Sequence, residues 1–155
     1  MRRIVLLLML LLSVPAMAGV ETVDELFAAY SGRDGYKTVV LGRKILSVMS
    51  KEDGAMSDVI GRINRIRVLS TEKSDTAVVN SALRIAEKEY ELFSQNIEDM
   101  ESTSFYIREE NDRDRSFLMV AHRTGQEIIM EISGDFKVTE ISKLSKFGTS
   151  TTSKH

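Results

Sequence analysis

His122 is the side chain best suited to acid–base chemistry, because imidazole titrates near neutral pH. The other histidine, His155, ends the chain. A nucleophilic hydrolase also needs a serine and an orienting carboxylate, and the nearby candidates are Ser116, Ser133 and Asp135. Neither serine lies in the G-x-S-x-G turn that exposes such a nucleophile. The sequence therefore favours a solvated histidine at a strand end over a catalytic one.

A second group of chemically capable residues is the acidic run Glu109, Glu110, Asp112 and Asp114. Carboxylate oxygens bind hard cations such as Ca²⁺. This run lacks the ligand spacing and the glycine of a calcium-binding loop, and three arginines partly neutralise it: Arg108, Arg113 and Arg115. We expect a solvated hairpin tip rather than a metal site.

Two further acidic positions invite a functional interpretation. Glu127 and Glu131 are a carboxylate pair of the kind used in glycoside hydrolysis, but their spacing places both on the polar face of a strand. Gly134 and Asp135 follow that strand, where a turn and a helix cap are the expected roles. The sequence therefore predicts no catalytic, cofactor-binding or metal-binding residue.

Composition excludes several classes of protein. The chain has no cysteine, which removes disulfides, thiolate catalysis, thiolate metal sites and a cysteine-linked lipid anchor. Arg2 and Arg3 precede the cleavage site proposed below. Without them the chain has 19 basic and 23 acidic residues, a net charge of −4. Nucleic-acid binding needs a basic surplus, so DNA and RNA are not expected partners.

Residues 1–18 have the three parts of a secretory signal peptide. Met1-Arg2-Arg3 is basic, Ile4–Leu12 is apolar and too short to span a membrane, and Ala16-Met17-Ala18 fits signal peptidase. We expect cleavage before Gly19 and an exported protein that is periplasmic or secreted. Residues 19–147 then form one domain, and residues 148–155 are expected to be a disordered tail.

Hydrophobic periodicity predicts an α+β fold in which a long amphipathic helix and shorter helices pack on one face of an antiparallel sheet. A capping box, Thr22 to Glu25, begins a first helix. The remaining elements are a strand at 36–41, a helix at 43–49, a strand at 63–69, the long helix at about 74–96, strands at 103–109, 116–122 and 126–133, and a last helix with Val138, Ile141 and Leu144 inward.

An ordered set of short motifs, none specific alone, spans the mature chain. They are Leu26-Phe27 with Tyr30-Ser31-Gly32, Ile45–Met49, Ile66–Ser70, Tyr90-Glu91-Leu92, and Ile132–Asp135 with Ile141–Leu144. The set resembles a domain-of-unknown-function family of small exported bacterial envelope proteins, the 4252 family. The resemblance implies no catalytic residue or ligand. It does imply gene neighbours of the extracytoplasmic sigma-factor type, and hence a role in an envelope response.

These features favour a non-enzymatic exported protein that binds another envelope protein. We expect the binding surface on the sheet face opposite the long helix, because Ile129 and the run Phe117–Ala121 place apolar groups on both faces of their strands. Two alternatives remain open: an envelope hydrolase that uses His122, and a carrier of a small apolar ligand with a cavity between helix and sheet.

Overall fold

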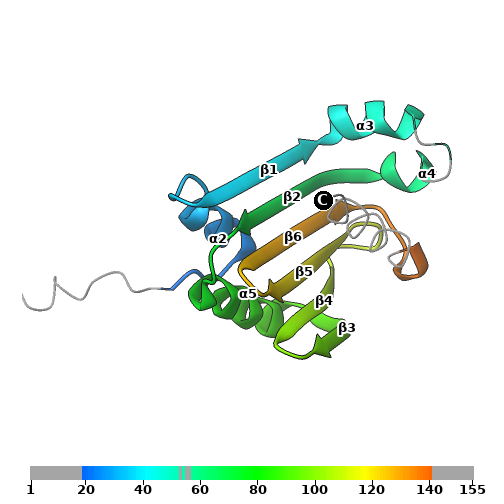
Figure 1. Ribbon diagram of the computed structural model, residues 1–155. Coiled ribbons are helices and arrows are strands. Elements are labelled where there is room, and N and C mark those ends of the chain that lie inside the picture. The colour runs from blue at the N-terminus through cyan, green and yellow to red at the C-terminus, as the bar shows by residue number, and fades with distance from the viewer. Residues whose placement is uncertain (1–18, 53, 55–56, 141–155) are drawn as a thin grey trace, which may run out of the picture.

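The computed structural model describes residues 19–52, 54 and 57–140. Six strands form one sheet in the order β1-β2-β6-β5-β4-β3, and every neighbouring pair is antiparallel (Figure 1). The strands are β1 (Tyr36–Gly42), β2 (Ile63–Thr71), β3 (Glu91–Glu98), β4 (Glu101–Glu109), β5 (Arg115–Arg123) and β6 (Gln126–Gly134). The predicted α+β class with an antiparallel sheet is confirmed.

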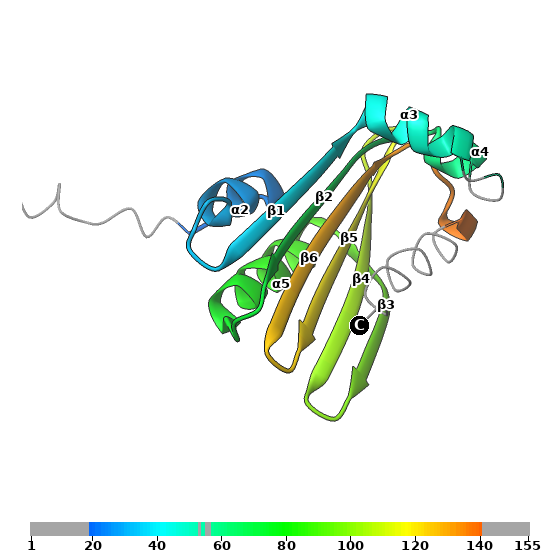
Figure 2. The ribbon, with the colours of Figure 1, turned by 45° about the horizontal axis from the view of Figure 1, so that its top comes forward.

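Helices flank the sheet, with α2 and α5 along one face and α3 and α4 at one end of the strands (Figures 1 and 2). Their bounds are α2 (Val23–Tyr30), α3 (Arg43–Glu52), α4 (Ser57–Ile60) and α5 (Thr76–Glu89), followed by a 3-10 turn, η1 (Val138–Glu140). The predicted capping box at the start of α2 is present. The Thr22 hydroxyl accepts from the Glu25 amide at 3.1 Å, and the Glu25 carboxylate accepts from the Glu21 amide at 2.9 Å.

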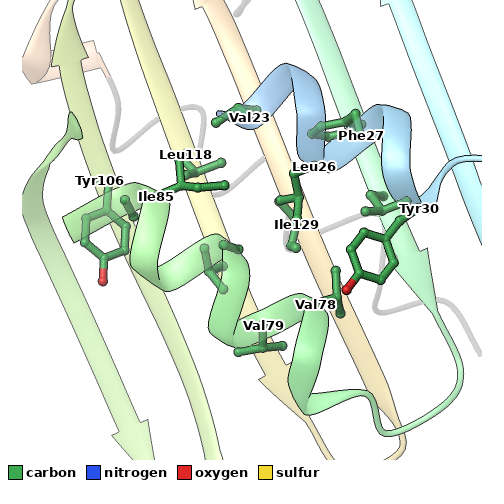
Figure 3. Close-up of a cluster of buried hydrophobic side chains, with 14 of the residues drawn as sticks. Val23, Leu26, Phe27, Tyr30, Val78, Val79, Ile85, Tyr106, Leu118 and Ile129 are labelled. Atoms are coloured by element: carbon green, nitrogen blue, oxygen red, sulfur yellow. The ribbon is translucent and has the colours of Figure 1, made fainter. Parts of the chain in front are cut away.

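The face covered by α2 and α5, here called the α5 face, carries the larger part of the core. Figure 3 shows side chains of the two helices meeting strand residues Leu118 and Ile129 between them. Ala82, Ile85, Leu118 and Ile129 are each at most 1% exposed. Burial of such side chains stabilises the fold by roughly 1.5–3 kcal/mol each for the larger ones.

The other side of the sheet, here called the opposite face, carries a second core cluster. Phe117, Met130 and Ile132 on the central strands pack with residues of α3, α4 and the segment after β6: Leu46, Val59, Ile60 and Phe136. Phe117 and Phe136 are fully buried. The central strands β5 and β6 are therefore apolar on both faces, as is usual for strands covered from two sides.

The long helix predicted for residues 74–96 is wrong from residue 90 onward. Helix α5 ends at Tyr90, which has an extended backbone, and the chain continues as strand β3. Phe93 and Ile97, which helical spacing from α5 would place inward, are 44% and 68% exposed. Apolar residues in this stretch have helical spacing in the sequence. As a strand, however, the backbone N–H and C=O groups of residues 91–98 hydrogen-bond to β4, whereas the last backbone C=O groups of a helix have no partner within the helix.

The other predicted elements up to β6 are found with shifts of a few residues, and α4 was not predicted. Where the last helix was expected to begin, the structure has the 3-10 turn η1, and Val138, predicted inward, is 41% exposed. A two-residue turn joins β3 to β4, and Asp99 adopts a positive φ of 54° there. Three predictions lie outside the described residues: the signal peptide at 1–18, the inward side chains of Ile141 and Leu144, and the tail at 148–155.

Candidate functional site

His122 forms a hydrogen-bonded pair with Glu127, its cross-strand neighbour on the β5–β6 hairpin. The imidazole Nδ1 lies 2.6 Å and 2.8 Å from the two carboxylate oxygens. Glu127 is 1% exposed, whereas the His122 side chain is 30% exposed. Burial raises the pKa of the Glu127 carboxyl, and the hydrogen bond and charge of His122 lower that pKa in part. The pair holds a half-exposed imidazole in one orientation.

A chain of hydrogen bonds extends this pair toward α5 and β1. The Glu127 carboxylate accepts from the backbone amide of Asp75, the residue that caps α5. The Asp75 carboxylate accepts a short hydrogen bond from the Tyr36 hydroxyl and another from the Ala77 amide at 3.0 Å. Burial, followed by the hydrogen bond to Asp75, raises the pKa of Tyr36. This network fixes the start of α5 against three strands, which is a structural role.

The serines considered for a hydrolase lie at the other end of the sheet. Ser116 and Ser133 pair with each other across β5 and β6, and His122 lies six positions along β5 from Ser116. At the rise of an extended strand this is about 20 Å. The Ser116 hydroxyl contacts the Tyr90 hydroxyl at 3.1 Å, and Asp135 lies 3.6 Å from Arg113. The Ser–His–Asp set considered from the sequence is therefore not assembled.

Glu131 and Arg67 form a buried ion pair on the α5 face, which corrects the prediction that Glu127 and Glu131 decorate a polar face. The Arg67 guanidinium donates to both Glu131 oxygens at 2.9 Å, and the two side chains are 10% and 5% exposed. The Arg67 Nη2 also lies 2.7 Å from the Asp24 carboxylate, and the Arg67 Cζ lies 4.5 Å from the centre of the Phe27 ring. The pair thus connects the sheet to α2.

The acidic run between β4 and β5 is engaged with neighbouring arginines. Arg108 binds Glu89 and Glu110 at 2.8 Å and 2.5 Å, and Arg115 lies 3.6 Å from Glu109. Among the residues that the structure describes, no group of three or more histidines or carboxylates could hold a metal ion. Arg108, Glu110, Asp114 and Arg115 instead line a hollow of about 420 Å³ beside the start of α2, together with other residues of both charges such as Asp24 and Arg65.

Space for a small apolar ligand would have to lie between α5 and the sheet. That region is filled by the side chains of the α5-face core. A hollow of about 610 Å³ lies instead at the outer end of β1 and β2, lined by residues such as Lys37, Glu72 and Lys73. Its mixed lining differs from the predominantly apolar wall of a carrier site.

Exposed apolar side chains gather at the edges of the sheet. Strand β3 is one edge, and all eight of its residues are exposed, including Leu92, Phe93 and Ile97. Met100, in the turn that follows, is 85% exposed. Ile129, used above to place a binding surface on the opposite face, points instead into the α5-face core. Phe117, Met119 and Ala121 do occupy the opposite face, as their register with β6 requires.

A family model described as "Domain of unknown function (DUF4252)" matches residues 30–144. The chain belongs to this family. The match confirms the resemblance stated from the sequence motifs, and it covers β1 through η1. No curated protein matches the chain by sequence. Within the part of the chain that the structure describes, no helix is long and apolar enough to cross a membrane.

Sequence reasoning missed both buried carboxylate pairs. The signal that could have shown them is the pair Ile128-Ile129, because two adjacent apolar residues in a strand place one on each face. A strand buried on both faces also buries the charged residues that share it. Glu131 then requires a basic partner on a neighbouring strand, and Arg67 is in register with it.

We predict strong coupling between Arg67 and Glu131 in a double-mutant cycle. Glu131→Leu or Arg67→Met alone should lower the free energy of unfolding by up to about 3–5 kcal/mol, because each removes the bidentate partner of a buried charge. What remains is one ion pair, Arg65 with Glu131 at 3.1 Å or Asp24 with Arg67 at 2.7 Å. The double variant should be more stable than either single variant.

Urea unfolding measures the free energy of unfolding of the wild type, the two single variants and the double variant. Arg113→Met is the control: the Arg113 side chain, which pairs with Asp135, is 82% exposed, so its loss should change stability by less than about 0.5 kcal/mol. Additive losses would contradict the buried pair.

We predict that His122→Ala raises the pKa of Glu127 further, because the variant removes a hydrogen bond and a charge that lower it. Carboxyl ¹³C NMR titration measures this pKa, and His155→Ala should leave it unchanged. An unchanged or lower Glu127 pKa in His122→Ala would contradict the pairing.

The raised pKa of Glu127 also has a consequence for stability. The native state holds this proton more tightly than the unfolded chain, so its contribution to the free energy of unfolding falls as pH rises from the ordinary carboxyl pKa through the raised one. Glu127→Gln removes that contribution. The stability of the wild type relative to this variant should therefore decrease over that interval, and an increase would show that the native pKa is depressed.

Proposed function

We propose that the protein is exported and acts without catalysis, by binding an extended segment of another envelope protein along strand β3. The observation that carries the proposal is the full exposure of this edge strand. An edge strand presents unpaired backbone N–H and C=O groups, and proteins commonly recognise extended peptides by adding a strand there.

The side chains of β3 provide apolar contacts for an added strand. By their register with β4, Leu92 and Ile97 point to the α5 face, and Phe93 lies at a bulge between them. Leu92 is 56% exposed and Ile97 68% exposed. Side chains from alternate positions of a bound segment would cover these residues, whereas an unpartnered strand leaves them in water.

The charges of β3 indicate the chemistry of its partner. Glu91 and Glu98 stand at the two ends of the strand, and Glu101 begins the next one. A second copy that paired its own β3 in the centred antiparallel register would place Glu91 opposite Glu98 twice, which is destabilising. A segment with an apolar centre and basic flanks matches the strand better.

The other edge of the sheet serves as an internal comparison. Strand β1 exposes Val39 and Val40, but basic residues lie along and after it: Lys37, Arg43 and Lys44. These charges favour an acidic partner. Pairing of β1 from one copy with β3 of another would be heterologous and would form rings or open filaments. We therefore commit to a different envelope protein as the ligand of β3.

The absence of catalysis in this proposal is supported by the separation of His122 from Ser116 and Ser133. Export is supported by the basic, apolar and small-residue segments of residues 1–18. A role in an envelope response follows from the family resemblance and rests on it alone.

Export predicts a mature protein that starts at Gly19 and fractionates with the periplasm or the medium. Intact-mass measurement of the protein from cells should show this N-terminus. Ala16→Arg should accumulate the uncleaved precursor, because signal peptidase requires a small residue at that position. A cytosolic protein that starts at Met1 would contradict export.

Strand addition predicts that a partner purified from envelopes binds the protein less tightly after Ile97→Lys. The loss should be at least tenfold, because lysine adds a charge and removes the most exposed apolar contact of β3, Ile97 being 68% exposed. Val40→Lys is the matched control, since Val40 is 57% exposed on the same face of the other edge strand. Titration calorimetry measures both affinities. NMR should also show shifts confined to β3 and β4 amides.

Three results would contradict strand addition at β3. Ile97→Lys could bind the partner as tightly as the wild type, or the shifted amides could lie in β1. Concentration-dependent filaments of the protein alone would instead identify a second copy as the occupant of the edge.

A further inference from the structure

Strand β1 and helix α3 gather basic side chains at one edge of the molecule. The segment from Gly35 to Glu52 has four basic residues and one acidic residue, a net charge of +3, whereas the chain without residues 1–18 has a net charge of −4. Helix α3 follows β1 directly, so the two elements form one continuous edge (Figure 1). Positive charge is therefore concentrated at one edge of an acidic protein. The four basic residues are Lys37, Arg43, Lys44 and Lys51.

Most of these charges are not used inside the protein. Lys37, Lys44 and Lys51 are exposed, and none of them forms an ion pair with another residue that the structure describes. Arg43 donates to the side-chain oxygen of Asn64 at 2.8 Å rather than to a carboxylate. By contrast, the arginines on β2 and β4 form ion pairs with carboxylates. The three lysines are therefore available to an anion outside the protein.

The outward side of α3 places apolar side chains beside these lysines. Val48 is 54% exposed and lies one helical turn from both Lys44 and Lys51. Ile45, one turn before Val48, is 45% exposed, whereas Leu46 on the inward side of the helix is 1% exposed. The exposed side of α3 is thus an apolar strip bordered by basic residues.

Strand β1 extends the same surface. Val39 is 51% exposed and lies two positions from Leu41, which packs against the core cluster of the opposite face. Lys37 lies two positions before Val39 and points to the same side. Helix α3 also packs on this side of the sheet, through Leu46. The exposed lysines and apolar residues of the two elements therefore lie on one side of the edge.

We propose that β1 and α3 form a surface that binds reversibly to bilayers containing anionic phospholipids. Helices that lie on a membrane combine exposed apolar residues with lysines, because the apolar side chains enter the boundary of the acyl chains while the charges meet anionic headgroups. Lysine stems can also lie in apolar surroundings while the ammonium groups reach the headgroups. The surface, here called the β1–α3 surface, consists of Lys37, Val39, Lys44, Ile45, Val48 and Lys51.

The apolar residues favour a bilayer over a purely ionic partner. A nucleic acid or a strongly acidic polypeptide would pair with the lysines but would leave Ile45 and Val48 in water. Two acidic residues lie near the surface and limit its attraction for anions: Glu52 at the end of α3, and Asp58 on the neighbouring α4, which pairs with Arg62 at 3.3 Å. We therefore expect binding that is peripheral and sensitive to salt.

The β1–α3 surface is separate from the strand proposed to bind a protein segment. Strand order places β1 at one edge of the sheet and β3 at the other. The protein would thus bind a bilayer along one edge while the other stays open to its partner. The inference goes beyond the proposed function, and either can fail without the other.

Vesicle flotation tests the proposal with the form expected after export, which starts at Gly19. Vesicles of phosphatidylcholine with about one third phosphatidylglycerol should bind the protein at low salt, and vesicles of phosphatidylcholine alone should not. Lys44→Gln with Lys51→Gln should weaken binding at least tenfold, because each lysine near an anionic bilayer contributes about fivefold. The matched control is Arg84→Gln with Lys88→Gln, which removes the same charge from exposed positions of α5 and should change binding less than about twofold.

Fluorescence identifies the edge that meets the bilayer, because the chain has no tryptophan of its own. Val48→Trp should shift its emission to shorter wavelength and be quenched by brominated lipid when anionic vesicles are added, since an indole favours the membrane interface. Ile97→Trp, at a 68% exposed position of β3, is the control and should show neither effect.

Four results would overturn the proposal. The protein could fail to bind vesicles with phosphatidylglycerol, or the control pair on α5 could weaken binding as much as the pair on α3. The fluorescence response could appear at Ile97→Trp and not at Val48→Trp. Binding to polyglutamate without binding to vesicles would assign the lysines to an acidic protein instead.

Discussion

The fold depends on one constraint: the central strands β5 and β6 are apolar on both faces, so both sides of the sheet must be covered. Leu118 and Ile129 pack under α2 and α5, while Phe117 and Ile132 pack against α3, α4 and Phe136. A sheet buried on two sides leaves only its edges in water. The strands that a macromolecule can reach are therefore the outer ones, and among these β3 is the most exposed.

The same constraint explains the buried charges. Glu127 and Glu131 share β6 with large apolar residues, so covering that strand also covers the two carboxylates. Each finds a partner within hydrogen-bonding distance: His122 at one end of the sheet and Arg67 nearer the other. These pairs connect α5 and α2 to the strands beneath them. Residues that resemble catalytic groups in the sequence thus act in this fold as polar anchors for helices.

Much of the architecture could be predicted from local patterns. The capping box at Thr22, the hairpin tip at the acidic run and most of the strands are predicted to within a few residues. Residues 90–96 are misassigned because Phe93 and Ile97, four residues apart, fit both helical spacing and strand alternation, and only pairing with β4 decides between them. The partners of Glu127 and Glu131 also depend on strand order, which no local pattern contains.

The central claim is that β3 is an open edge strand on a sheet whose middle is covered on both faces. Amide hydrogen exchange of the isolated protein tests it most directly. The account predicts that amides of β5 and β6 exchange only through global unfolding. Amides of β3 that do not bond to β4 should exchange orders of magnitude faster. Uniform protection across residues 91–98, or the i-to-i−4 pattern of a helix continuing from α5, would contradict it.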